Sequence, residues 1–305
     1  MGMRFCRSPL GAAAVVLLLG LSVVLGTTVL RALHATSPQR QAASAIDFES
    51  MLIQVQEVEF PSADELRLSG WLFPAGPGRP TVILCHDAGQ SKAALINLAI
   101  SLSEDGFGVL VFDFRGHGSS GDGRTTLGLH EKRDVLGAVD YLTGRPGGDD
   151  QRIGVFGVGM GAHAAVLAAI DRPAVKVLVL DGLYPDVAYP LAREVFDDWV
   201  LAERFLGFLP RSVFLALCGS STDSQRAADH VGNLVGRDLL LLAPEDDERL
   251  VEEMRTMYET IPEQVDTDGN LVVLPATQLN RLSAQHLALY QARVRSFFVD
   301  RLGQG

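Results

Sequence analysis

A glycine-rich turn is the part of this sequence whose residue types and spacing come closest to catalytic chemistry. The apolar run 152–156 predicts a short buried strand, and the run 160–167 predicts a helix. Between them lies Gly157-Val158-Gly159-Met160-Gly161. A sharp strand–turn–helix of this kind can hold the side chain of its middle residue above a sheet, where a serine or cysteine would attack a substrate. Here the middle residue is Gly159, which tolerates the positive φ of the turn but offers no attacking atom.

The same glycines permit another interpretation, in which Gly154, Gly157 and Gly159 cradle a dinucleotide pyrophosphate at the start of the helix. Their spacing is not G-x-G-x-x-G, and the expected strand is the fifth of the chain rather than the first. The histidines and the three cysteines lack the spacing of zinc ligands. We therefore expect neither a cofactor nor a metal ion.

A second block of residues follows the apolar strand 109–112. It reads Asp113-Phe114-Arg115-Gly116-His117-Gly118-Ser119-Ser120-Gly121, with Glu131 and Asp134 further on. In order and spacing it resembles the D-x-R-G-H-G-x-S block of the α/β-hydrolase superfamily, nearest to its serine-aminopeptidase-like and dienelactone-hydrolase-like branches. The resemblance covers roughly residues 50 to 302. It implies that the turn at Gly159 is the nucleophile elbow of the superfamily, from which the nucleophile has been lost.

The resemblance also assigns the acid of a catalytic triad, which in this superfamily follows the order Ser, Asp, His. Asp247, after the apolar strand 239–242, takes the acid position, with Asp246 as the alternative. The acidic run 246–248 equally suits the positive end of a helix that begins there, and both causes can act together.

The base position falls on Leu279, a few residues beyond the expected strand 271–274. Leucine can neither take a proton from a nucleophile nor give one to a leaving group, so we expect the base to be lost. His286 is the alternative base. It lies just after a helix cap expected at Ser283, which favours a ring that packs or faces solvent unless a loop shift brings it to the elbow.

The oxyanion-hole positions implied by the resemblance are the backbone N–H groups of Ala88 and Met160. His86-Asp87-Ala88-Gly89 stands where the superfamily usually has H-G-x-G. A carboxylate at Asp87 would oppose the build-up of negative charge at that place. Nucleophile, base and oxyanion loop therefore all depart from the pattern of an active enzyme.

Strands and helices alternate along the chain as a doubly wound sheet requires. We expect an α/β-hydrolase fold, with a mostly parallel eight-stranded sheet, helices on both faces and a first antiparallel pair of strands. The expected strands are 51–60, 66–73, 82–85, 108–112, 152–156, 174–180, 238–242 and 271–274. Residues 184–235 show no strand pattern and are expected to form a helical lid.

An uncharged stretch from Ser8 to Leu30 precedes this domain. As a helix, residues 10–30 would be about 31 Å long, enough to cross a bilayer core. Arg4 and Arg7 favour a cytoplasmic N-terminus and hence an extracytoplasmic domain. We expect a single-pass membrane anchor at residues 1–36, a linker at 37–48 and a hydrolase-like domain at 49–302. The alternative is a cleaved signal peptide and a secreted protein.

The chain has 26 basic and 37 acidic residues, a net charge of −11. Because residues 1–40 hold four arginines and no acid, the negative excess lies in the remainder, and we expect no nucleic-acid partner. The sequence identifies no protein partner. The apolar lid region favours a small apolar or acyl-bearing ligand.

Two classes of function remain. The first is a membrane-anchored, catalytically degenerate pseudohydrolase that binds a ligand or partner. The second is an active hydrolase of ester or amide bonds with a relocated nucleophile. The hydroxyls and thiols near expected loop ends are Cys85, Ser91, Ser119, Ser120 and the pair at 220–221, and none lies on a turn that would present it to a base. We favour the first class.

Overall fold

The computed structural model describes residues 9–37, 40, 53–76, 78–145, 152–196, 208–218, 226–261, 271–275 and 283–303. The chain forms two compact units. Residues 1–36 and 187–222 make up the smaller unit, and residues 37–186 and 223–305 make up the larger one. The lid region expected at 184–235 is therefore divided, and its central part belongs with the N-terminal helix.

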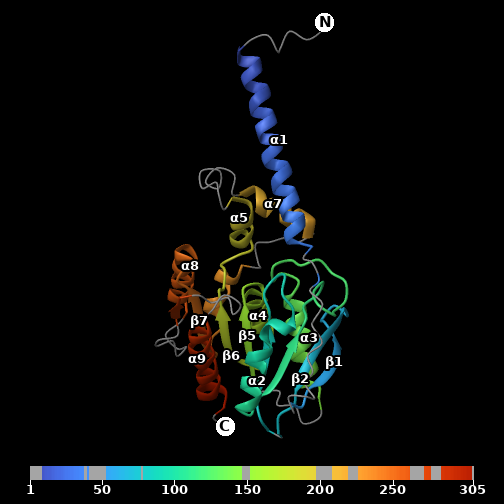
Figure 1. Ribbon diagram of the computed structural model, residues 1–305, viewed down its shortest axis with the longest axis vertical. Helices are drawn as coiled ribbons and strands as arrows, with labels where there is room; N and C mark the ends of the chain where they lie inside the picture. Colours follow the sequence, from blue (N-terminus) through green and yellow to red (C-terminus); the bar gives the residue numbers. More distant parts are fainter. Residues whose placement is uncertain are drawn as a thin grey trace. The chain divides into compact units, whose positions relative to one another are not determined.

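Eight strands form one sheet in the larger unit, in the order β1-β2-β4-β3-β5-β6-β7-β8 (Figure 1). β1 is antiparallel to β2 and β2 to β4, while all the other neighbours are parallel. The expected mostly parallel, eight-stranded sheet is thus confirmed. The strands are β1 (Gln56–Pro61), β2 (Arg67–Phe73), β3 (Thr81–Cys85), β4 (Gly108–Phe112), β5 (Ile153–Val158), β6 (Val175–Asp181), β7 (Asp238–Pro244) and β8 (Leu271–Leu274).

Helices cover both faces of this sheet, as expected from the sequence. A Cβ added to Gly154 of β5 would lie 2.7 Å from Cε1 of Phe298 in α9, whereas one added to Gly157 would lie 2.6 Å from the backbone N of Ala162 in α4. Alternate residues of one strand therefore face different helices. The helices of this unit are α2 (Ile96–Glu104), α3 (Lys132–Thr143), α4 (Met160–Asp171), α8 (Glu248–Glu259) and α9 (Ala284–Leu302).

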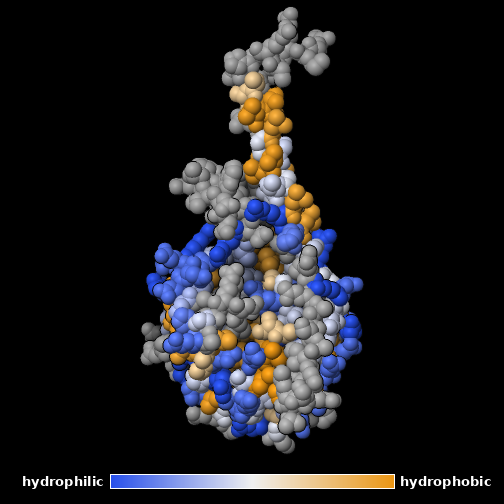
Figure 2. Space-filling view, viewed as in Figure 1, coloured by the Kyte–Doolittle hydropathy of each residue, from blue (hydrophilic) through white to orange (hydrophobic). Residues whose placement is uncertain are grey.

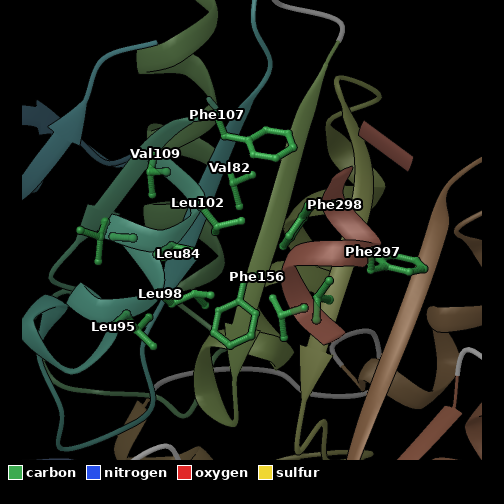
Figure 3. Packing of buried hydrophobic residues seen from close by; sticks show 14 of the residues in the cluster. Val82, Leu84, Leu95, Leu98, Leu102, Phe107, Val109, Phe156, Phe297 and Phe298 are labelled. Atoms are coloured by element: carbon green, nitrogen blue, oxygen red, sulfur yellow. The ribbon is translucent and has the colours of Figure 1, made fainter. Parts of the chain in front are cut away.

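The main hydrophobic core lies between the sheet and the two helices α2 and α9 (Figure 3). Leu98 and Leu102 of α2 and Phe298 of α9 are almost fully buried there against Val82 and Phe156 of the central strands. Burial of apolar surface on this scale is the main term that stabilises such a domain. The same packing fixes the ends of β3 and β5, from which the candidate site is built.

The sequence also predicts helices over residues 92–104 and 128–142, and in the structure both α-helices begin later. The predicted helix from Lys92 begins with a 3₁₀ turn, η2 (Lys92–Leu95), because Asp113 binds both the backbone N–H and the ammonium group of Lys92. The helix predicted from Gly128 begins at Lys132 instead. Leu127 and Gly128 have φ values of 52° and 103°, which no α-helix accommodates.

The smaller unit is helical. It comprises α1 (Pro9–Ala35), α5 (Ala188–Phe196) and α7 (Phe208–Cys218), which pack against one another (Figure 1). Thr28 and Ala32 toward the C-terminal end of α1 are fully buried, as is Phe214 of α7. The helices of the expected lid are thus structural partners of the N-terminal helix.

One segment of α1, Ala12–His34, is long and apolar enough to cross a membrane by length and composition, as an anchor or a signal sequence would be. Its hydrophobic side chains lie on the surface, among them Val16, Leu19 and Leu30 (Figure 2). A helix that exposes so much apolar surface needs a nonaqueous environment or a partner.

Candidate functional site

The turn between β5 and α4 has the geometry of a nucleophile elbow. Gly159 adopts φ 50° and ψ −108°, and it directly precedes the first residue of α4. Its backbone N–H donates to the carbonyl of Asp181 at 2.8 Å, and its own carbonyl accepts from the N–H of His163 at 3.0 Å. These bonds fix the turn at the carboxyl edge of the sheet. In an L-residue this φ is strained, and glycine removes the strain together with the attacking side chain.

A second glycine of the turn allows the start of α4 to approach strand β3. A Cβ added to Gly161 would lie 2.3 Å from the carbonyl oxygen of Cys85, the last residue of β3. No other residue type fits at this separation. The close approach brings the N–H of Met160, at the start of α4, next to the loop that follows β3.

Asp87, on that loop, fills the space that a nucleophile would occupy. A Cβ added to Gly159 would lie 2.3 Å from Oδ1 and 2.6 Å from Cγ of Asp87. The same Oδ1 accepts hydrogen bonds from the backbone N–H of Ala88 at 2.7 Å and of Met160 at 2.9 Å. These are the two N–H groups that the sequence assigns to the oxyanion hole. Both donors converge on one oxygen atom, and that oxygen belongs to the protein itself.

The two oxygens of Asp87 have different surroundings. Desolvation raises the pKa of this carboxyl group, while the N–H groups of Met160 and Ala88 oppose the rise by stabilising the ionised form. Its position at the N-terminus of α4 adds a favourable interaction with the helix dipole. Oδ2 accepts no hydrogen bond within the part of the chain that the structure describes, and the residue is partly exposed.

Two histidines brace the loops around Asp87. Nδ1 of His86 donates to the carbonyl of Asp87 at 2.7 Å, and Nε2 accepts from the N–H of Phe114 at 3.1 Å. Nδ1 of His117 donates to the carbonyl of Arg115 at 2.8 Å, and Nε2 accepts from the N–H of Gly89 at 3.2 Å. All four ring nitrogens are engaged by backbone groups, so neither ring can take a proton from a nucleophile in this arrangement. Desolvation lowers the pKa of His86 to about 3, with a further contribution from His117.

Arg115 holds this loop to two other parts of the larger unit. Its guanidinium group donates to Asp134 of α3 and to Asp64 of the β1–β2 turn, with Nη2–Oδ1 distances of 2.6 and 2.7 Å. A fork of N–H donors bound to two carboxylates is rigid as well as stable. Arg115, with Asp64 and Asp134, therefore supports the loop that contains it without taking part in the elbow itself.

A second loop packs behind the elbow, and the sequence alone did not reveal it. Oε1 and Oε2 of the buried Glu131 accept from the N–H groups of Thr126 and Gly128 at 2.8 and 2.9 Å. The hydroxyl of Tyr184 donates to the carbonyl of Leu127 at 2.6 Å. The sequence does contain a signal for this loop, because two threonines and a glycine are closely followed by Glu131. This spacing suits a carboxylate bound by nearby backbone N–H groups.

His163, one turn into α4, is fully buried and stacks on Tyr184, with ring centroids 5.0 Å apart. Neither of its ring nitrogens has a hydrogen-bond partner among the described residues. Desolvation, and to a lesser degree His230, lowers the pKa of His163 to about 3, so the ring is neutral at physiological pH. His163 therefore packs inside the fold, and its buried nitrogens without partners carry a cost in stability.

The predicted acid lies at a helix start. Asp247 is the N-cap of α8, and its side chain accepts from the backbone N–H of Leu250 at 3.1 Å. This hydrogen bond agrees with the interpretation that the acidic run 246–248 marks the start of a helix. Its assignment to the acid position of a triad stays a prediction.

The predicted base positions lie at the C-terminal end of the fold. Leu279 falls outside the described residues. Ser283 caps α9, as expected, by accepting from the N–H of His286. The side chain of His286 is exposed in the first turn of α9, and its ring has no hydrogen-bond partner among the residues described.

A buried pair that sequence analysis missed lies at the end of β6. The hydroxyl of Tyr290 in α9 donates to Oδ2 of Asp181 at 2.5 Å. Burial and the neighbouring carboxylate raise the pKa of this phenol well above its usual value. The pair ties α9 to the strand whose carbonyl binds Gly159, so it positions the elbow.

Comparison with known proteins agrees with this architecture. Residues 76–203 match the family described as serine aminopeptidase, S33. The uncharacterized protein Rv2307c of Mycobacterium tuberculosis is 31% identical over 185 residues, which cover 57% of this chain and 64% of that protein. The chain has the α/β-hydrolase fold, and its residues 76–203 match this family in sequence. The resemblance found in the sequence is thereby confirmed.

Solved hydrolase structures show the same fold. An esterase of Pyrococcus furiosus, Pf2001, superimposes with a TM-score of 0.68 at 23% identity, over 88% of this chain and 99% of that one. A dienelactone hydrolase of Anabaena variabilis superimposes with a TM-score of 0.56 at 20% identity, over 82% of this chain and 99% of that one. The matched region spans just under two thirds of the length of the curated relative named above.

Two of the other hydroxyls and thiols near the carboxyl edge of the sheet, those of Cys85 and Ser120, are buried in structural surroundings. Cys85 is buried at the end of β3, and desolvation raises the pKa of its thiol. The hydroxyl of Ser120 is buried, donating to the carbonyl of Asp113 and accepting from the N–H of Ser69. Ser91 precedes η2, Ser119 is exposed, and residues 220–221 lie outside the described residues.

No group of three or more His, Cys, Asp or Glu side chains that could hold a metal ion occurs among the described residues of this hydrolase fold.

Proposed function

We propose that this chain is a membrane-anchored pseudohydrolase, which keeps the α/β-hydrolase fold to bind a ligand or partner and does not hydrolyse it. One observation carries the proposal. Asp87 occupies the space above Gly159 and takes both N–H donors assigned to the oxyanion hole.

The chemistry of acyl transfer supports this interpretation. Hydrolysis through a covalent intermediate needs a nucleophile, and Gly159 has none. It also needs donors for the negative charge that develops on the substrate oxygen, and removal of one such donor typically slows an enzyme by about 10²–10³-fold. Here both donors already bind Oδ1 of Asp87, so a substrate would have to displace Asp87 before they could act.

The anchor is the second part of the proposal. The length and apolar surface of Ala12–His34 support a single membrane-spanning helix. Arg4 and Arg7 before it favour a cytoplasmic N-terminus and an extracytoplasmic domain, while Arg31 and Arg40 after it weaken that bias. A secreted protein, formed by cleavage of a signal peptide, is the alternative.

An active hydrolase of ester or amide bonds remains the alternative function, because the fold is shared with esterases. A direct test is turnover of 4-nitrophenyl esters and amides by the purified full-length protein and by Gly159→Ser. We expect no turnover above the uncatalysed rate from either, since the variant gains a hydroxyl without a base or free oxyanion donors. Turnover by the wild type would establish the alternative, and turnover by Gly159→Ser alone would show that a functional base is present.

A further inference from the structure

The elbow of this chain offers a hydrogen-bond acceptor where an acyl-transfer site offers donors. The N–H groups of Ala88 and Met160 are both engaged by Oδ1 of Asp87. The remaining oxygen, Oδ2, accepts no bond from the residues that the structure describes. A ligand that enters here therefore meets a carboxylate oxygen rather than two N–H groups.

The carboxyl group of Asp87 is partly exposed, and Oδ2 is not among the fully buried unpartnered atoms of the described residues. A Cβ added to Gly89, two residues after Asp87, would meet no heavy atom within 4 Å, so the described residues leave space beside this turn of the loop. A ligand can therefore approach Oδ2 without displacing a hydrogen-bond partner.

The side chains around the elbow make no hydrogen bond to Oδ2 of Asp87 among the described residues. The ring nitrogens of His86 and His117 bind backbone groups instead. The hydroxyl of Tyr184 donates to the carbonyl of Leu127, so its proton is not shared with the carboxylate.

We propose that the elbow binds an amine in its ammonium form, with Oδ2 of Asp87 as the counter-ion, and excludes acyl and carboxylate heads. The inference rests on the proposed function and specifies the ligand of that same site. An ammonium group donates three hydrogen bonds, and its positive charge would pair with a partly desolvated carboxylate that has no other counter-ion among the described residues. A carbonyl or carboxylate head brings only acceptors, and a second anion would be repelled.

The test compares short ligands of four carbon atoms each, which differ mainly in the polar head group. Butylammonium, butyrate and butanol are titrated against the full-length protein in nanodiscs, with dissociation constants measured by calorimetry. We expect butylammonium to bind at least about 10-fold more tightly than butyrate or butanol. Equal binding of butylammonium and butyrate would overturn the proposal.

Two variants test whether Asp87 is responsible for the preference for butylammonium. Asp87→Asn keeps an oxygen that can accept from Ala88 and Met160 but removes the charge, and it should weaken butylammonium by about 10-fold or more. Asp87→Gly frees both donors and should gain butyrate binding. Glu57→Gln, a charge removal on the exposed face of β1, is the matched control and should change neither. Unchanged butylammonium binding in a folded Asp87→Asn would contradict the proposal.

The outcome is separable from that of the proposed function. The same samples are assayed for hydrolysis of 4-nitrophenyl butyrate. Turnover by the wild type would refute the pseudohydrolase proposal whatever the amine titration gives. Absence of turnover together with no preference for butylammonium would refute only the inference about the ligand.

Discussion

Asp87 shows how one side chain can change what a conserved arrangement of backbone donors binds. Peptide N–H groups at a helix N-terminus are a ready site for an anion. In this chain the anion is Oδ1 of Asp87, held at 2.7 and 2.9 Å by Ala88 and Met160. The contact stabilises the loop after β3 against α4. It also accounts for glycine at position 159, since any Cβ there would collide with the carboxyl group.

The first prediction at the level of a single residue concerns the stability effect of His163. His163→Phe keeps a planar ring against Tyr184 and removes two buried nitrogens without partners, so we expect it to stabilise the fold by about 1–2 kcal/mol at pH 7. The pKa of His163 is about 3 in the fold and about 6.5 when unfolded, so only the unfolded chain binds this proton over that range, and the wild type loses stability as the pH falls from 6.5 toward 3. The variant should lose stability less steeply over this pH range.

Thermal unfolding between pH 7 and pH 4 measures both effects. His286→Phe, an exposed position on α9, is the control and should change stability by less than about 0.5 kcal/mol. A His163→Phe protein that is less stable than the wild type at pH 7 would show that the imidazole has a partner that stabilises it.

At the level of elements, the strand–turn–helix of β5 and α4 predicts strong coupling between Gly159 and Asp87. Gly159→Ser imposes a side chain at φ 50°, which costs about 1–3 kcal/mol, and places its Cβ within 2.3 Å of Oδ1 of Asp87. We expect the single variant to lose at least about 3 kcal/mol of stability. When Gly159→Ser is introduced into the Asp87→Gly protein, the loss of stability should fall to the cost of the backbone strain alone.

Gly182→Ser provides a matched control for this cycle. Gly182 has a similar φ of 61°, but a Cβ there would meet no heavy atom within 4 Å. Its loss of stability therefore measures the cost of positive φ without a collision. If Gly159→Ser and Gly182→Ser cost the same, or if Asp87→Gly gives no relief, the placement of Asp87 above the elbow is incorrect.

Most elements of this fold could be predicted because they have strong local signals. The strand, the glycine turn and the helix around Gly159 follow from apolar periodicity and glycine spacing. The conflict between Asp87 and an oxyanion could also be recognised in the sequence. The binding of both donors by one oxygen could not, because it depends on the rotamer of Asp87 and on the close approach that Gly161 permits.

Other features escaped prediction because they depend on contacts between distant residues. Tyr290 and Asp181 are 109 residues apart, and neither has a local signal for a buried hydrogen bond. The start of α3 at Lys132 rather than Gly128 follows from the positive φ of Leu127, a residue type that rarely adopts it. Local propensity cannot foresee such a strained turn.

At the scale of the whole molecule, the lid helices α5 and α7 group with the N-terminal helix rather than with the sheet. The sequence placed them in the hydrolase-like domain because they are inserted between its strands. Their packing partner is instead an apolar helix long enough to cross a bilayer. Because α5 and α7 pack on α1, we expect both helices to lose stability when α1 is removed.

Membrane extraction tests this grouping. The full-length protein should stay with membranes in carbonate and high salt and be released by detergent, with an intact mass of 32.8 kDa. Deletion of residues 1–36 should remove the packing partner of α5 and α7 and make residues 187–222 more sensitive to protease. A soluble protein shortened by cleavage near residue 36 would contradict the anchor and support a signal peptide.

The most direct test of a lost nucleophile is the intact mass of the wild-type protein after incubation with a fluorophosphonate, which forms a stable adduct with activated serines. A sample of an active esterase of this superfamily serves as the positive control. We predict that the mass of the wild-type chain is unchanged while the esterase is fully modified, because Gly159 offers no oxygen at the elbow. A stoichiometric adduct on any serine of this chain would contradict the account.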